Sequence, residues 1–131
     1  MSTQSNKDLV RRFFDERWNH GNLDVYDEML APNSNIKNHK EWVRSMYAIF
    51  GNIELAILDL VAEDEQVAVH WRFAGVHQGD YLGVAATGKQ VTYQGIGLLR
   101  VVDGKIVDDV AYWDNLPILQ QLGALPASVR V

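Results

Sequence analysis

The chain has 131 residues, the usual size of one domain, with 47% hydrophobic and 22% charged residues. Its formal net charge of -5 argues against nucleic acid as a partner, because phosphate binding depends on Lys and Arg. The absence of cysteine excludes disulfides, thiolate nucleophiles and Cys-ligated metals. The opening residues are polar, and no apolar run reaches the roughly 20 residues that span a bilayer. We expect one cytoplasmic domain over residues 1–131 that does not enter a membrane.

The first third of the chain has the apolar spacing of helices. We expect a first helix with Ser5 as its N-cap, a short second helix over residues 23–30, and a third with Asn38 as its N-cap. The turn residues 19–22 separate the first two. The buried face of the first helix repeats every three or four residues, at Leu9, Val10, Phe13, Phe14 and Trp18.

From residue 53 the period changes from helical to alternating. Strands are expected over residues 53–61, 67–77, 91–102 and 106–113, with a Gly-rich loop over residues 78–88 and a short final helix after Asp114 or Asn115. Helices followed by antiparallel strands indicate the α+β class.

The last two strands are joined at Asp103-Gly104, and this turn allows two registers. A two-residue loop places Leu98 opposite Asp109. A three-residue loop with Gly104 in a bulge instead places Gly97 opposite Asp109, and we favour it because it brings small side chains together. That register has three pairs on one face: Gly97 with Asp109, Gly95 with Ala111, and Tyr93 with Trp113.

Asp109 is the main catalytic candidate. In a hollow walled by aromatic groups, desolvation would raise the pKa of its carboxyl toward neutrality, which suits a general acid or base. Tyr93, if its hydroxyl lies beside Asp109, would supply a hydrogen-bond donor. If the hairpin edge is exposed, Asp108 and Asp109 are simply solvated.

Further residues are candidates for lining a pocket for a small hydrophobic ligand, although each also suits core packing. They are Trp18, Trp42, Met46, Tyr47, Trp71, Gly97, Ala111 and Trp113. The four histidines have no i, i+4 pair, so we expect no metal site, and no Gly-rich phosphate loop follows a strand, so we expect no cofactor. We expect His70 on the outer face of the sheet and His77 in a structural hydrogen bond. His39, at the start of the third helix, could reach the pocket mouth, but we do not count it among the pocket residues.

Seven short stretches have a specific order and spacing that cover nearly the whole chain. They are residues 18–24, 67–71, 75–79, 88–92, 99–107, 113–114 and 119–123. Together they resemble the SnoaL-like polyketide cyclases of the NTF2-like superfamily. The resemblance implies an α+β cone, in which amino-terminal helices pack over a strongly curved, mainly antiparallel sheet that encloses a pocket, and a homodimer formed through that sheet.

The resemblance also implies an enzyme that closes a ring by intramolecular aldol condensation without a cofactor, using an acid and a nearby His. In the family the returning strand reads His, any residue, Asp. The matching positions here are Asp109, Val110 and Ala111, so the family's principal acid is absent and Asp109 stands at the position of the His.

Three hypotheses follow. The first is a cofactor-independent enzyme acting on a hydrophobic carbonyl compound, by cyclisation, isomerisation or dehydration, with Asp109 and Tyr93 as catalytic residues. The second is a binding protein of the same fold that has lost the chemistry, and the third is a structural role. An epoxide hydrolase would need two acids bridged by an Arg, whereas Arg72 and Arg100 are expected to point away from Asp109.

Overall fold

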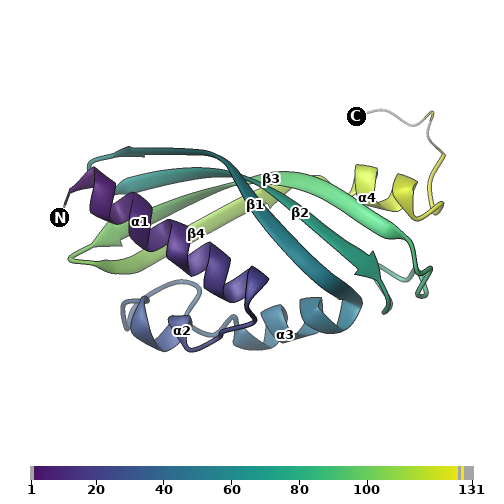
Figure 1. The fold of residues 1–131 in the computed structure, drawn as a ribbon, viewed down its shortest axis with the longest axis horizontal. Coiled ribbons are helices and arrows are strands. Elements are labelled where there is room, and N and C mark those ends of the chain that lie inside the picture. The colour runs from purple at the N-terminus through teal and green to yellow at the C-terminus, as the bar shows by residue number, and fades with distance from the viewer. Residues whose placement is uncertain (1, 127, 129–131) are drawn as a thin grey trace.

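The structure is a computed structural model that describes residues 2–126 and 128. One antiparallel sheet contains four strands in chain order, β1 (Phe50–Glu63), β2 (Gln66–His77), β3 (Gln90–Val102) and β4 (Lys105–Trp113). All four strands are long and the sheet is curved (Figure 1). The strands lie where alternation predicted them, with β1 starting three residues earlier, directly after the preceding helix.

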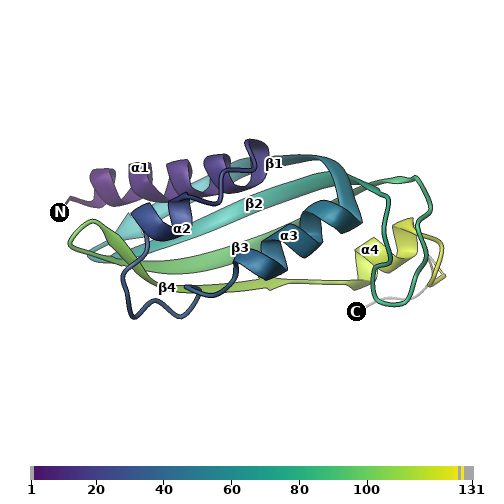
Figure 2. The ribbon, with the colours of Figure 1, turned by 90° about the horizontal axis from the view of Figure 1, so that it is seen from below.

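Helices α1 (Thr3–Phe14), α2 (Val25–Glu28) and α3 (Lys40–Ile49) cover one face of this sheet, as Figures 1 and 2 show from two directions. Helix α1 continues into a π-helical turn, η1 (Asp15–Asn19). Helix α4 (Leu116–Gln121) follows β4 at the far end of the molecule. The predicted α+β cone is therefore confirmed, with the helices on the concave side.

Two predicted helix caps are wrong. Helix α1 begins one turn earlier than expected, with Ser2 as its N-cap, because the Ser2 hydroxyl accepts a hydrogen bond from the Ser5 backbone N–H at 3.0 Å. Helix α3 has His39 rather than Asn38 at its N-cap, and no side chain caps it.

The core lies between the helices and the concave face of the sheet. Strand β2 shows why, since its residues alternate between buried and less buried along its whole length. The buried face of β2 carries the apolar residues that the pattern predicted, Val67, Val69, Trp71 and Phe73.

Neither predicted register of the β3–β4 hairpin is correct. The turn has two residues, because Asp103 and Gly104 both have positive φ, 50° and 76°, and Val102 pairs with Lys105. A bulge then interrupts the ladder, since Val101 pairs with Ile106 but Arg100 pairs with Asp108. Beyond the bulge the pairs are Leu99 with Asp109, Gly97 with Ala111, and Gly95 with Trp113.

The extra residue, Val107, shifts β4 so that Asp109 faces the helices. This is the face that the favoured register also predicted, although with different partners. The segment before α3 covers the free edge of β4: the Asn35 side chain accepts from the Asp109 backbone N–H at 2.9 Å and donates to its carbonyl at 3.1 Å. The Asn35 backbone N–H also bonds the Val107 carbonyl at 3.2 Å. Asp109 is therefore fixed from both sides.

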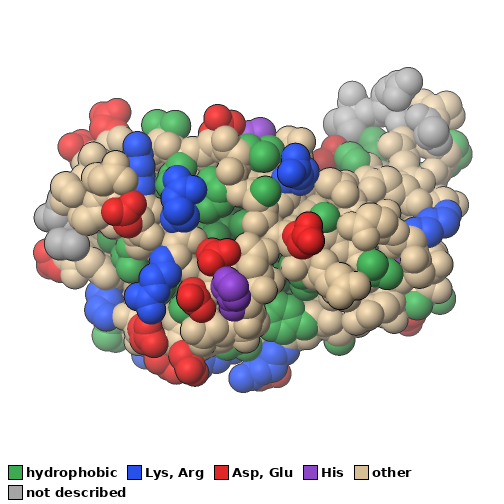
Figure 3. Space-filling model, viewed as in Figure 1, with side chains coloured by type: hydrophobic (Ala, Val, Ile, Leu, Met, Phe, Trp, Pro, Cys, Tyr) green, Lys and Arg blue, Asp and Glu red, His purple; other side chains and the backbone are tan. Residues whose placement is uncertain are grey.

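Acidic and basic side chains are mixed over the face drawn in Figure 3, and neither sign of charge gathers there. Among the residues that the structure describes, no helix is both long and apolar enough to cross a membrane.

The glycines of β3 give a first testable prediction. A Cβ on Gly95 would lie 2.2 Å from the Trp71 indole, whereas a Cβ on Gly97 would meet no atom closer than 3.6 Å. We expect Gly95→Ala to lower the free energy of unfolding by about 1–3 kcal/mol, because a rigid indole must shift. The matched change Gly97→Ala should be nearly neutral. Denaturant unfolding measures both, and equal losses would contradict the close packing of Trp71 on Gly95.

Candidate functional site

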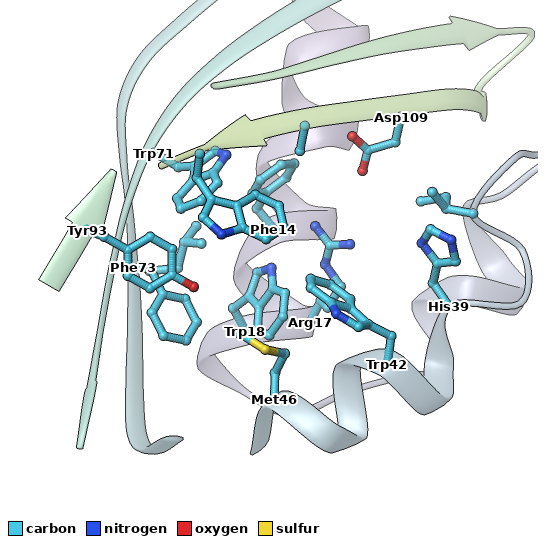
Figure 4. Close-up of a pocket in the computed structure, with 14 residues that line it drawn as sticks. Phe14, Arg17, Trp18, His39, Trp42, Met46, Trp71, Phe73, Tyr93 and Asp109 are labelled. Carbon is cyan, nitrogen blue, oxygen red and sulfur yellow. The ribbon is translucent and has the colours of Figure 1, made fainter. Parts of the chain in front are cut away.

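A cavity of about 420 Å³ opens between the helices and the sheet. Its wall is mainly aromatic and is formed by side chains from α1, η1, α3, the segment before α3 and all four strands, many of which Figure 4 shows converging on the cavity. Eight of the ten residues proposed from the sequence line it: Trp18, Trp42, Met46, Trp71, Tyr93, Asp109, Ala111 and Trp113. Six others were not proposed as site residues, and they are Phe14, Arg17, Ile36, His39, Leu55 and Phe73.

The other two proposed residues lie just behind the wall. Tyr47 packs edge-on against Trp18, with ring centroids 6.0 Å apart, and its hydroxyl donates a hydrogen bond to the Arg17 carbonyl. Gly97 lies beneath Asp109, since a Cβ there would be 3.8 Å from the Asp109 Oδ1 atom. The hollow expected from the small residues is partly filled, because Trp71 occupies the space over Gly95.

Among the described residues, Asp109 is the only acid that lines the cavity. Its Oδ1 atom is buried and has no hydrogen-bond partner among the described residues. Desolvation raises the pKa of the Asp109 carboxyl above the ordinary 3.8, while the nearby charges of Arg17 and His39 act in the opposite direction. The site therefore holds a carboxyl that accepts a proton more readily than one in water.

Arg17 was missed by the sequence analysis, although a signal was present. It follows Phe13 by four residues and Phe14 by three, which places it on the apolar face of the first helix. Its side chain is buried, with its guanidinium carbon 4.2 Å from the Phe13 ring centroid. Its Nη1 atom donates to the Tyr26 hydroxyl at 3.1 Å, and its Nε atom has no partner among the described residues.

Tyr93 does not lie beside Asp109, which corrects the expected pairing. Asp109 pairs with Leu99, six residues along β3 from Tyr93, and Figure 4 shows the two side chains at opposite ends of the cavity. Burial raises the pKa of the Tyr93 hydroxyl, which therefore stays protonated. Among the described residues it has no hydrogen-bond partner, so it is a free donor at the end opposite Asp109.

Two exposed tryptophans lie at the mouth of the cavity. Trp42 is 42% exposed and Trp113 is 37% exposed, and their ring centroids are 6.2 Å apart. His39 lies beside Trp42, with the two ring centroids 6.4 Å apart, and completes this rim near Asp109 (Figure 4). His39 thus lies at the pocket mouth, although it was not among the residues expected to line the pocket.

The remaining histidines lie elsewhere. His70 bonds Asp59 and Gln94 on the outer face of the sheet, and these hydrogen bonds raise its pKa. His77 is fully buried and bonds the Thr87 hydroxyl, as a structural residue would. In the described part of the chain, no three His, Asp or Glu side chains are arranged to hold a metal ion.

Comparisons with known proteins converge on one family. Residues 8–122 match the family described as SnoaL-like polyketide cyclase. The aklanonic acid methyl ester cyclase DnrD of Streptomyces peucetius is 31% identical, with 94% of this chain and 92% of DnrD covered. DauD of Streptomyces sp. (strain C5), with the same description, is also 31% identical, with 88% of this chain and 80% of DauD covered.

Solved structures show the same fold. AclR from Streptomyces galilaeus, described as a candidate hydroxylase, superposes with a TM-score of 0.87 at 25% identity, covering 95% of this chain and 89% of AclR. A SnoaL-like protein from Jannaschia sp. CCS1 superposes with a TM-score of 0.83 at 23% identity, covering 95% of each chain.

The raised pKa of Asp109 has a consequence for stability. Between pH 3.8 and the higher folded-state pKa, the folded protein holds a proton that the unfolded chain releases, so stability falls as pH rises through this window. We expect Asp109→Asn to raise the melting temperature at pH 7 and to lose this advantage below about pH 3.8.

Thermal unfolding over this pH range measures the effect. The control is Asp108→Asn on the other face of β4, where Asp108 bonds Arg100 at 3.0 Å; this change should not stabilise the protein. An Asp109→Asn variant no more stable than the unmodified protein at pH 7 would show that the carboxylate is well solvated.

Proposed function

The chain belongs to the SnoaL-like polyketide cyclase family, and we propose that it is a cofactor-independent enzyme that acts on a small hydrophobic carbonyl compound of the polyketide type. The observation that carries this proposal is the Asp109 carboxyl, which lines an aromatic cavity and has a buried oxygen without a partner in the described part of the chain. A carboxyl of this kind can exchange protons with a bound ligand, because no protein donor competes for that oxygen.

The proposed reaction is ring closure by intramolecular aldol addition. Asp109 removes a proton from the carbon next to a carbonyl group, and the electrons of the C–H bond form an enolate. The enolate carbon attacks a second carbonyl of the same molecule, forming a C–C bond. The protonated Asp109 then returns its proton to the new alkoxide oxygen, so the enzyme ends unchanged.

Tyr93 is proposed as the donor that orients the substrate at the opposite end of the cavity. Its hydroxyl is protonated and free, and a distal carbonyl or hydroxyl of the ligand would accept its hydrogen bond. The proposed role is binding and orientation, because the cavity separates Tyr93 from the proton-transfer group.

Ala111 supports a second candidate, a non-catalytic binding protein. The family resemblance implies an acid at this position, and here the side chain is a methyl group that lines the cavity. This alternative predicts that a ligand stabilises the protein without being converted, so one set of measurements separates the two functions.

The test of the proposal is the Asp109→Asn variant. Aklanonic acid methyl ester, which the relatives' names identify as their substrate, is the first compound to assay, followed by other polyketide esters. We expect turnover to fall by about 10²–10⁴-fold, because general acid–base catalysis supplies that much. Ligand affinity, measured by calorimetry, should change little.

The control for this test is Asp108→Asn, which should keep full turnover. Retained turnover in Asp109→Asn would contradict the proposed chemistry. Ligand binding without conversion by the unmodified protein would favour the binding function.

The orienting role of Tyr93 predicts a different kinetic pattern. Tyr93→Phe removes one hydrogen bond from a distal part of the substrate, so KM should rise by about 5–10-fold with kcat changed much less. Steady-state kinetics with the same substrate measures the two constants. A loss confined to kcat would instead place Tyr93 in the chemical step.

A further inference from the structure

The buried Arg17 is a charged residue of the cavity that the proposed chemistry does not use. Its side chain is 6% exposed, and its guanidinium is directed into the cavity on the side of Asp109 (Figure 4). No ion pair joins Arg17 to Asp109, although the positive charge is close enough to lower the pKa of that carboxyl. The Arg17 guanidinium and the Asp109 carboxyl thus face the same cavity without direct contact.

Both groups also have an unused polar atom. The Nε atom of Arg17 and the Oδ1 atom of Asp109 are buried and lack partners among the described residues. An unpaired buried donor or acceptor costs free energy, so an arrangement with one of each favours a ligand that satisfies both. Such a ligand needs an oxygen that accepts from Arg17 and a proton that Asp109 can take.

The protein holds these two groups through both edges of its sheet. On β1, the Asn19 side chain bonds the Leu55 backbone N–H at 2.7 Å and the Leu55 carbonyl at 3.0 Å, which fixes the π-helical turn that carries Arg17. On β4, the Asn35 side chain bonds the Asp109 backbone in the same way. Tyr47 adds a hydrogen bond to the Arg17 carbonyl. π-Helical turns often occur at functional sites.

We infer that Arg17 is a catalytic residue that binds the enolate oxygen formed when Asp109 removes the substrate's proton, an inference that rests on the proposed function. Arg17 donates to the ground-state carbonyl, and its hydrogen bond strengthens as negative charge develops on that oxygen. Electrons move from the C–H bond to the oxygen and then into the new C–C bond. The proton travels from carbon to Asp109 and on to the alkoxide, and no other reactant is consumed.

This role defines the substrate more closely. The acidic carbon and the carbonyl oxygen must be neighbours on one face of the ligand, so that one reaches Asp109 while the other reaches Arg17. The rings of Phe13, Phe14 and Trp18, with centroids 4.2, 5.0 and 5.1 Å from the guanidinium carbon, keep water from the cation. In such a place the charge acts more strongly on a developing oxyanion than it would in water.

Kinetics of Arg17→Met gives the first test. We expect kcat to fall by about 10²–10³-fold, as for loss of an oxyanion donor, with KM nearly unchanged. The pH midpoint of kcat/KM should rise, because Asp109 loses the positive charge that lowers its pKa. Arg12→Gln, an exposed arginine one turn earlier in α1, is the control and should change neither. An unchanged kcat or an unchanged pH midpoint in a folded Arg17→Met variant would overturn the inference.

Stability separates this role from a structural one. A buried guanidinium without full pairing is expensive to keep, so replacement by Met should leave the melting temperature unchanged or raise it. A structural role for Arg17 predicts a lower melting temperature.

A second measurement needs no turnover. 4-Nitrophenol is a flat aromatic whose colour reports its ionised form, and its bound oxygen mimics the enolate oxygen. In Asp109→Asn, where the competing carboxylate is absent, we expect the pH midpoint for ionisation of the bound probe to lie below that of the free probe. Adding Arg17→Met should abolish this shift, whereas adding Arg12→Gln should keep it.

The same midpoint with and without Arg17 would overturn the inference. If the shift depends on Arg17 but the protein has no cyclase activity, Arg17 is an anion-binding residue and the proposed function is wrong.

Discussion

The pairing of β3 with β4 determines whether the cavity contains an acid. Side chains alternate along a strand, so a shift of one residue turns each of them to the other face. The two-residue turn at Asp103-Gly104, continued without interruption, would place Asp109 beside the outward-facing Leu98. The bulge at Val107 adds one residue and returns Asp109 to the inner face. Asn35 then holds that backbone position with two hydrogen bonds. The chemistry of the cavity thus depends on one inserted residue.

The aromatic wall strengthens the electrostatic effect of placing Asp109 and Arg17 in one cavity. In water, a carboxylate and a guanidinium interact weakly and are both well solvated. Between Phe14, Trp18 and Trp71 they lose water, and the structure does not compensate them by direct contact with each other. Burying these two charged groups costs folding free energy, and apolar residues would pack the same space more favourably. Because the protein keeps them despite this cost, we interpret them as functional.

The sequence predicted the sheet and most of the cavity, because alternation along β2 and β3 places their inward residues unambiguously. It could not predict the register of β4, since a bulge leaves no mark on a hydrophobic pattern. Arg17 was overlooked because charged residues are usually assigned to solvent, although its spacing from Phe13 put it on the buried face. In the favoured register Tyr93 already lay four residues along the strand from the partner of Asp109, and the observed register increases this separation to six, so the expected contact does not form.

The alternation along β4 also explains how a site can keep its acid while the sequence pattern changes. Positions 109 and 111 point to the same face and lie about 7 Å apart along the strand. An acid at either position enters the same cavity, but only the one at 109 has its backbone fixed by Asn35 and its charge influenced by Arg17 and His39. A carboxyl moved from position 111, where Ala111 is exposed, to position 109 therefore becomes more buried and has different polar neighbours. In the proposed reaction the cation that Asp109 faces binds the enolate oxygen, so Arg17 is as informative about the substrate as Asp109 itself.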